Sequence, residues 1–214
     1  MGPLEALLGL VVPPSCWACG SRARKREPLC LTCRGELRWL DSDPVELAGV
    51  KVWAPLAYDG GARDVVRGLK FRGAAGLAQP MAAQIAACAP ARLLCPPTRL
   101  VPVPLHPARA RARGYNQAER LAAALAARTG MRVSDCLRRC GAAGGHQVGR
   151  GREARLVAIA GSVECRPRAL VPERALLVDD VVTTGGTVAA CADALHAGGA
   201  IDVAAVAYAL TPGR

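Results

Sequence analysis

The residues with the clearest capacity for chemistry are two adjacent carboxylates that precede a loop of threonines and glycines. Asp179 and Asp180 follow an apolar run at 175–178, and the segment 183–187 contains only Thr and Gly. The apolar run is typical of a strand buried on both faces of a parallel sheet, and ligands bind at the carboxyl edge of such sheets. Small residues let backbone N–H groups approach a phosphate, and the helix expected from Val188 points its positive end at the same place. The order therefore predicts a sugar-phosphate site.

Each part of this stretch has an expected role. Asp179 and Asp180 are candidate catalytic residues, which would hold ribose hydroxyls or a Mg²⁺ ion coordinated to them. The candidate phosphate- and ribose-binding residues are Thr183, Thr184, Gly185, Gly186 and Thr187. The stretch lacks the Gly-Lys-Ser/Thr ending of a P-loop and the spaced glycines of a dinucleotide fingerprint, so both of those sites are excluded. The alternative is a chance strand–turn–helix without a ligand.

A second strand-to-helix connection carries a cluster of arginines. The strand expected over 99–105 contains two prolines at its carboxyl end, which stop sheet pairing and release the chain into a loop at 106–117. The candidate pyrophosphate-side residues are Arg109, Arg111, Arg113, Gly114, Asn116 and Gln117. The helix expected over 116–128 again directs its N-terminus at the loop. A basic loop in this place suits a pyrophosphate, and the alternative is an ordinary solvated turn.

Four cysteines near the N-terminus have the spacing of a structural metal site. They are two CxxC pairs, made by Cys16, Cys19, Cys30 and Cys33. Two such pairs supply the four sulfurs of a closed tetrahedral Zn²⁺ site. A redox role is less favoured because neither pair lies in a βαβ pattern, and unmetallated thiols are the remaining alternative.

The charge of the chain is uneven along its length. The formal net charge is +11, from 28 basic and 17 acidic residues. A codon bias towards Arg is the alternative explanation for this excess. The segment 99–155, however, contains 12 Arg against three acidic residues, a net +9. A uniform bias would not concentrate charge in this way, so the segment favours a surface that faces an anion such as a polyphosphate or a nucleic acid.

Length and pattern predict an α/β fold in two parts. At 214 residues the chain allows one full domain and a small appendage, which we place at 46–214 and 1–45. Strands are expected at 50–58, 99–105, 175–178 and 201–210, and helices at 62–69, 77–88, 116–128 and 188–197. This order predicts a mainly parallel sheet with helices on both faces.

The sequence predicts a cytoplasmic protein. No apolar run reaches the 18 or more residues of a membrane span. The first 12 residues lack the basic lead of a signal peptide and have the apolar stripe of a short packing helix. In the cytoplasm the ten cysteines would be metal ligands or reduced thiols rather than disulfides.

Three segments together resemble a known family. The stretch 175–187 resembles the phosphoribosyl-pyrophosphate signature of type I phosphoribosyltransferases. The segment VPVPLHPARARARGYNQAERLA at 101–122 is similar to the hallmark of the ComF/GntX branch of phosphoribosyltransferase-like proteins. That branch also carries an N-terminal four-cysteine zinc ribbon and a segment similar to LKFRG at 69–73. The resemblance spans residues 16–208.

The resemblance implies a type I phosphoribosyltransferase-like fold that binds phosphoribosyl pyrophosphate with Mg²⁺. It places the ribose 5-phosphate on 179–187 and the pyrophosphate on 109–117. It also implies a hood over the site from 131–161, in which Gln147 and Arg155 match the pattern of relatives. Ala158 and Val163 depart from that pattern, where relatives have Asn and Phe.

Two functions of different class follow from the resemblance. The first is an enzyme in which a nitrogen nucleophile displaces pyrophosphate from the anomeric carbon, with a ComF-type role in DNA uptake or a role in nucleotide metabolism. The second is a non-catalytic binding protein of natural competence, which handles incoming single-stranded DNA together with helicase and recombination-mediator partners. Aromatic residues that could stack on bases are few, at 3% of the chain, and this weighs against the second function.

Overall fold

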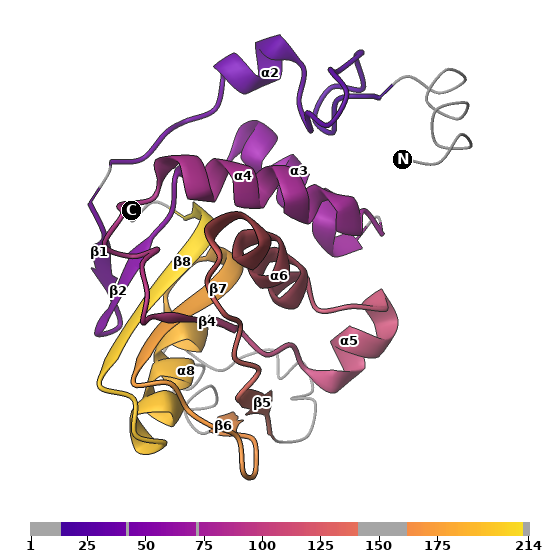
Figure 1. Cartoon of the computed structure of the whole chain (residues 1–214). Coiled ribbons are helices and arrows are strands. Elements are labelled where there is room, and N and C mark those ends of the chain that lie inside the picture. The colour runs from indigo at the N-terminus through magenta and orange to yellow at the C-terminus, as the bar shows by residue number, and fades with distance from the viewer. Residues whose placement is uncertain (1–13, 42, 72, 141–161, 212–214) are drawn as a thin grey trace.

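The computed structural model describes residues 14–41, 43–71, 73–140 and 162–211. In this part the main sheet has six strands in the order β1–β2–β8–β7–β4, with β3 also paired to β8 (Figure 1). These strands are β1 (Val45–Leu47), β2 (Val50–Trp53), β3 (Leu56–Ala57), β4 (Arg99–Pro102), β7 (Arg174–Val182) and β8 (Asp202–Leu210). β1 is antiparallel to β2, and the other pairings in this sheet are parallel. The expected α/β fold with a mainly parallel sheet is confirmed.

Helices cover both faces of the sheet (Figure 1). The helical elements are α2 (Leu31–Gly35), α3 (Gly60–Phe71), η1 (Ala75–Leu77), α4 (Ala78–Cys88), α5 (Pro107–Arg113), α6 (Gln117–Thr129) and α8 (Gly186–Ala197). On one face α3, α4 and α6 pack with Leu176 and Val178 of β7. On the other face α8 packs with Leu177, together with the hairpin of β5 (Leu137–Arg139) and β6 (Val163–Cys165). Successive residues of β7 therefore serve opposite cores, as the alternation of a strand requires.

The expected loop at 106–117 is wrong, because most of it is the helix α5. His106 caps this helix, since its Nδ1 accepts a hydrogen bond from the backbone N–H of Ala108 at 3.2 Å. Pro107 occupies the first helical position, where its fixed φ is favourable and its missing N–H costs nothing. Gly114 then ends the helix with φ +79°. Cap, proline and glycine together define a helix that the repeated Ala-Arg pattern concealed.

The expected end of the signature strand is also wrong. β7 does not stop at Val178 but continues to Val182, because β8 lies parallel beside it up to the pairing of Val182 with Leu210. Asp179 and Asp180 are therefore residues of the strand rather than of the loop that follows. The alternation of the strand turns their side chains towards opposite faces of the sheet.

The four-cysteine segment packs directly on α3 through two glycines. Gly61 and Gly68 are about two helical turns apart and lie on one face of the helix. A Cβ atom at Gly68 would lie 2.7 Å from a ring carbon of Trp17 and 2.8 Å from a methyl of Leu77. One at Gly61 would lie 3.1 Å from a methyl of Leu29. The missing side chains let the segment approach the helix backbone and share its core. The domain boundary at residue 45 stays a prediction.

In the described part of the chain, no helix combines the length and the apolar character needed to cross a bilayer. The packing helix expected in the first 12 residues lies outside the described residues.

We expect the substitution Gly68→Ala to lower the free energy of unfolding by about 1–3 kcal/mol, the usual cost of overpacking a well-packed core. The added methyl group must displace the Trp17 ring or the Leu77 side chain. Urea unfolding followed by circular dichroism measures the change. The matched control is Gly35→Ala in α2, where a Cβ would meet nothing within 4 Å and alanine favours a helix. Equal stability of G68A and the natural chain would contradict the packing described here.

Candidate functional site

The chain leaves the carboxyl ends of the neighbouring strands β4 and β7 towards opposite edges of the sheet. After β4 the chain passes through α5 and α6 to Val133, which pairs in parallel with Leu100 of β4. After β7 it passes through α8 to β8, on the other side of β7. Loops that diverge from neighbouring parallel strands open a crevice, and ligands bind there in open α/β sheets. Both anion-binding segments predicted from the sequence follow these two strands.

The loop after β7 exposes its threonines and buries its glycines. Thr183 and Thr184 are exposed, whereas Gly185 and Gly186 are buried. Gly185 has φ +80°, and a Cβ there would lie 2.9 Å from the Cβ of Leu47 in β1. Only glycine fits this position, because both the backbone conformation and the neighbouring strand exclude a side chain. Gly185 precedes α8 without a side-chain cap, so backbone N–H groups of the first turn are left for an anion.

The two acids of β7 differ in their surroundings. The Asp180 side chain is 1% exposed, and its Oδ1 lies 2.8 Å from Nζ of Lys70, at the end of α3. Its second oxygen, Oδ2, is buried without a hydrogen-bond partner among the described residues. Asp179 is partly exposed, and its Oδ1 accepts a hydrogen bond from the backbone N–H of Asp180 at 2.8 Å. Asp179 is thus the more exposed of the two residues, although protein atoms surround its carboxyl.

Burial controls the protonation of this pair. It raises the pKa of Asp180, and the Lys70 ammonium acts in the opposite direction. Burial, followed by the neighbouring Asp180 carboxylate, raises the pKa of Asp179 to about 8. Two adjacent carboxylates cannot both ionise cheaply away from water. A cation bound at Asp179 would favour the ionised carboxylate and would therefore lower the pKa of that residue.

The helical form of α5 separates the predicted arginines. Arg109 and Arg113 lie on one side of a helix, since they are four residues apart, while Arg111 points elsewhere. Arg109 and Arg111 are exposed, and Arg113 is partly buried. The Nη1 of Arg113 donates to Oε1 of Gln117 at 3.0 Å, and its guanidinium lies 4.9 Å from the centre of the Phe71 ring. The three arginines therefore cannot all face one ligand in this arrangement.

The remaining predicted residues of this segment build the turn between α5 and α6. Asn116 is 6% exposed and caps α6, where its Oδ1 accepts from the backbone N–H of Ala118 at 3.0 Å. Its Nδ2 donates to the carbonyl of Val103 at 3.1 Å. Gln117 is 6% exposed and holds Arg113. These amides fix the geometry of the turn, and their contact with pyrophosphate stays a prediction.

Sequence analysis missed the residues at the end of α3 as part of this site. Lys70 forms an ion pair with Asp180, and the Phe71 ring makes a cation–π contact with the Arg113 guanidinium. The Tyr115 hydroxyl donates a hydrogen bond to the carbonyl of Leu69. The signal available was the LKFRG segment itself, which ends a helical pattern with a lysine and an aromatic residue. Its partners are 40 or more residues away in the sequence, so the spacing gave no indication of the contact.

The four N-terminal cysteines converge on one point. Their sulfur atoms all lie within 4.8 Å of one another, and the Sγ atoms of Cys19 and Cys30 are 3.7 Å apart. Sulfurs around a tetrahedral ion with metal–sulfur bonds of about 2.3 Å are about 3.8 Å apart. Gly20 has φ +77°, and its N–H donates to the carbonyl of Cys16 at 3.0 Å. The cluster therefore has the donors and the spacing to hold a structural metal ion.

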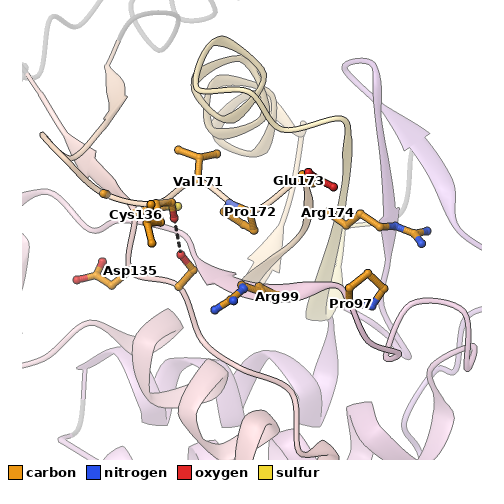
Figure 2. Close-up of a pocket in the computed structure, with 11 residues that line it drawn as sticks. Pro97, Arg99, Asp135, Cys136, Val171, Pro172, Glu173 and Arg174 are labelled. Atoms are coloured by element: carbon orange, nitrogen blue, oxygen red, sulfur yellow. Dashed lines mark hydrogen bonds between the residues drawn. The ribbon is translucent and has the colours of Figure 1, made fainter.

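The predicted hood and the hollows of the surface are not part of the site described above. The hood residues Gln147 and Arg155 are outside the described residues. A hollow of about 520 Å³ lies at the amino ends of β4 and β7, opposite the candidate site, and Arg99, Glu173 and Arg174 are among the residues around it (Figure 2). A second hollow, of about 930 Å³, lies between the cysteine segment and α4. None of the predicted catalytic or phosphate-binding residues lines either hollow.

No model of a known protein family matches the chain, and no curated protein matches it.

We expect Lys70→Met to destabilise the chain by about 3 kcal/mol near pH 8, the low end for a broken buried ion pair because the Lys70 side chain is 17% exposed. The loss should shrink near pH 5. Burial raises the pKa of Asp180 and Lys70 lowers it. The folded K70M chain, which lacks the lysine, therefore takes up a proton at Asp180 before the unfolded chain does as the pH falls, and the isolated charge disappears. Urea unfolding at both pH values measures this.

The double variant Lys70→Met/Asp180→Asn is the matched control, because it removes both charges and should recover most of the stability near pH 8. A deficit of K70M that is the same at both pH values would show that packing of the lysine, rather than its charge, stabilises this edge.

We expect the purified chain to carry about one metal ion and Cys19→Ser to lose it, because three thiolates and a hydroxyl bind far more weakly than four thiolates. Elemental analysis of the purified protein measures the content. The matched control is Cys88→Ser, since Cys88 is an exposed thiol in α4 outside the cluster. Retention of the metal by C19S, or its absence from the natural chain, would contradict a metal site here.

Proposed function

We propose that the chain is a phosphoribosyltransferase-like protein of the ComF/GntX type that binds phosphoribosyl pyrophosphate. The observation that supports this best is the position of two segments with the chemistry of anion binding. The Thr-Gly loop after β7 and the basic helix α5 after β4 lie at the ends of neighbouring parallel strands. That point of the sheet is where the topology opens a crevice for a ligand.

In this proposal each end of the ligand has its own segment. The 5′-phosphate lies against the N–H groups that begin α8, with the exposed Thr183 and Thr184 hydroxyls as further donors. The pyrophosphate lies towards α5, where Arg109 is exposed and Arg113 lies on the same side of the helix. The N-terminus of α8 and the guanidinium groups of α5 would share the negative charge of the ligand.

Asp179 is the carboxyl that we assign to the ribose hydroxyls or to Mg²⁺, because Asp180 is engaged by Lys70. Asp180 then acts as a positioning residue that holds the end of α3. The pKa of Asp179 is raised to about 8, and a bound divalent cation would favour the ionised carboxylate. Mg²⁺ would supply neutralisation of the pyrophosphate when bound.

The reaction that we propose is transfer of the phosphoribosyl group to a nitrogen nucleophile. The carbon–nitrogen bond forms at the anomeric carbon, the carbon–oxygen bond to pyrophosphate breaks, and its electron pair leaves with the pyrophosphate. The nitrogen releases its proton to solvent. Negative charge therefore develops on the leaving group, close to α5. Arginines fixed before the reaction stabilise such charge without reorganisation, and the phosphate loop supplies positioning.

The metal of the cysteine cluster is zinc in this proposal, with a structural role. Four thiolates with the 3.7 Å spacing of Cys19 and Cys30 suit a closed tetrahedral ion. A cytoplasmic location is part of the same proposal, since thiols remain reduced and available to zinc there.

A second candidate function is a non-catalytic protein that binds single-stranded DNA, with helicase and recombination-mediator partners in natural competence. The specific observation in its favour is that Arg109 and Arg111 of α5 are both exposed. Exposed guanidinium groups along a short helix can follow a phosphate backbone without occupying the crevice.

We expect calorimetry to detect binding of phosphoribosyl pyrophosphate with Mg²⁺ to the natural chain, and Thr184→Tyr to weaken it at least about tenfold. The exposed Thr184 leaves room for the tyrosine ring, which would displace the phosphate and cost at least one charged hydrogen bond. Thr32→Tyr is the matched control, because Thr32 is an exposed threonine in α2.

Absence of binding by the natural chain, or equal binding by T184Y, would contradict the proposed site. The same variants distinguish the second function when binding to oligothymidylate is measured across salt concentrations. Binding of the oligonucleotide that falls steeply with salt and survives T184Y, in a chain that does not bind phosphoribosyl pyrophosphate, would favour the DNA-binding function.

A further inference from the structure

Phe71 is the only phenylalanine of the chain, and 70% of it is exposed. A single exposed apolar side chain is common in soluble proteins and by itself needs no explanation. Phe71, however, is the last residue of α3, which ends beside the candidate site. The contacts of the last turn of α3 hold the ring in this place.

Three contacts fix the end of α3 to three separate parts of the candidate site. The Tyr115 hydroxyl donates to the carbonyl of Leu69 from the turn between α5 and α6. Lys70 reaches Asp180 in β7, with 2.8 Å between Nζ and Oδ1. The guanidinium of Arg113 in α5 lies 4.9 Å from the centre of the Phe71 ring. Successive residues of α3 thus each have a partner from the site, and Phe71 directly follows the lysine that pairs with Asp180.

The Arg113 guanidinium is itself fixed in position. It donates to the side chain of Gln117, which is 6% exposed, at 3.0 Å. A guanidinium at this distance from a ring makes a cation–π contact, which restrains the ring. With that contact in place the residue is still 70% exposed, so much of its π surface remains open to solvent beside a basic helix.

An aromatic ring that is exposed and restrained by one guanidinium has the properties of a stacking platform for a nucleobase. Every base has a flat π face, and stacking on aromatic side chains tolerates differences between bases. We propose that the Phe71 ring stacks on the base of a nucleoside 5′-phosphate whose phosphate occupies the loop 183–187. This inference rests on the proposed function and adds to it the position of the base.

Two ligands that differ only in the base provide the test. Adenosine 5′-monophosphate and ribose 5-phosphate share the sugar phosphate, and ribose 5-phosphate lacks the base. We expect Phe71→Ala to weaken binding of adenosine 5′-monophosphate by roughly 5- to 150-fold, the range that base–aromatic stacking supplies. Binding of ribose 5-phosphate, which has neither a base nor a pyrophosphate, should be unchanged. Calorimetry with each ligand and Mg²⁺ measures these affinities.

Two variants control for the size and the position of the change. Phe71→Trp keeps an aromatic face and should retain or improve the affinity for adenosine 5′-monophosphate. Leu170→Ala removes another exposed apolar side chain, 91% exposed, at the opposite edge of the sheet, and should change no affinity. Because Phe71 is exposed, F71A should fold normally, and its thermal unfolding checks this.

The outcomes separate this inference from the proposed function. If the natural chain binds phosphoribosyl pyrophosphate but F71A binds adenosine 5′-monophosphate as well as the natural chain does, the stacking platform is wrong and the proposed function stands. If F71A loses ribose 5-phosphate to the same extent, Phe71 only supports the fold of the site and the inference is also overturned. If the natural chain binds none of the three ligands, the proposed function fails together with the inference.

Discussion

The ion pair between Lys70 and Asp180 is the interaction on which the carboxyl edge of the sheet depends. Asp180 is buried in β7, where pairing with β8 fixes its place. A carboxylate held away from water is costly unless a cation meets it, so the end of α3 must come to the strand. Tyr115 and Arg113 then find the neighbouring residues of the same helix. The ion pair and these two contacts thus join α3, α5 and β7 at one place.

α3 also connects this edge to the cysteine segment. Its Gly61 and Gly68 present bare backbone to Leu29 and Trp17, and its last turn carries Lys70. A helix is stiff over this length, so the position of the segment and the position of Lys70 are set together. A metal that fixes the cysteine segment would therefore also stabilise the carboxyl edge, although the two sites share no residue. Close packing at glycine is what makes the connection rigid.

The helical geometry of α5 decides in which directions its three arginines point. As a loop this segment could turn every arginine towards one ligand. A helix turns by about 100° per residue, so arginines two positions apart point to nearly opposite sides. Arg111 is directed away from Arg109 and Arg113, and Arg113 is restrained on Phe71. One side of α5 therefore carries Arg109 and Arg113, and another side carries Arg111. This division allows the same short helix to serve either of the two proposed functions.

The sequence by itself determined the parallel α/β sheet, the four-cysteine cluster and the segments that follow β4 and β7, because these depend on local patterns: apolar runs, CxxC spacing and glycine-rich turns. It did not determine that α5 is a helix or that β7 continues through Asp179 and Asp180, since a cap and a neighbouring strand decide those points. Only the tertiary structure decided the partners of Asp180 and the place of Phe71. These contacts join residues far apart in the chain, and burial and charge, rather than spacing, select them.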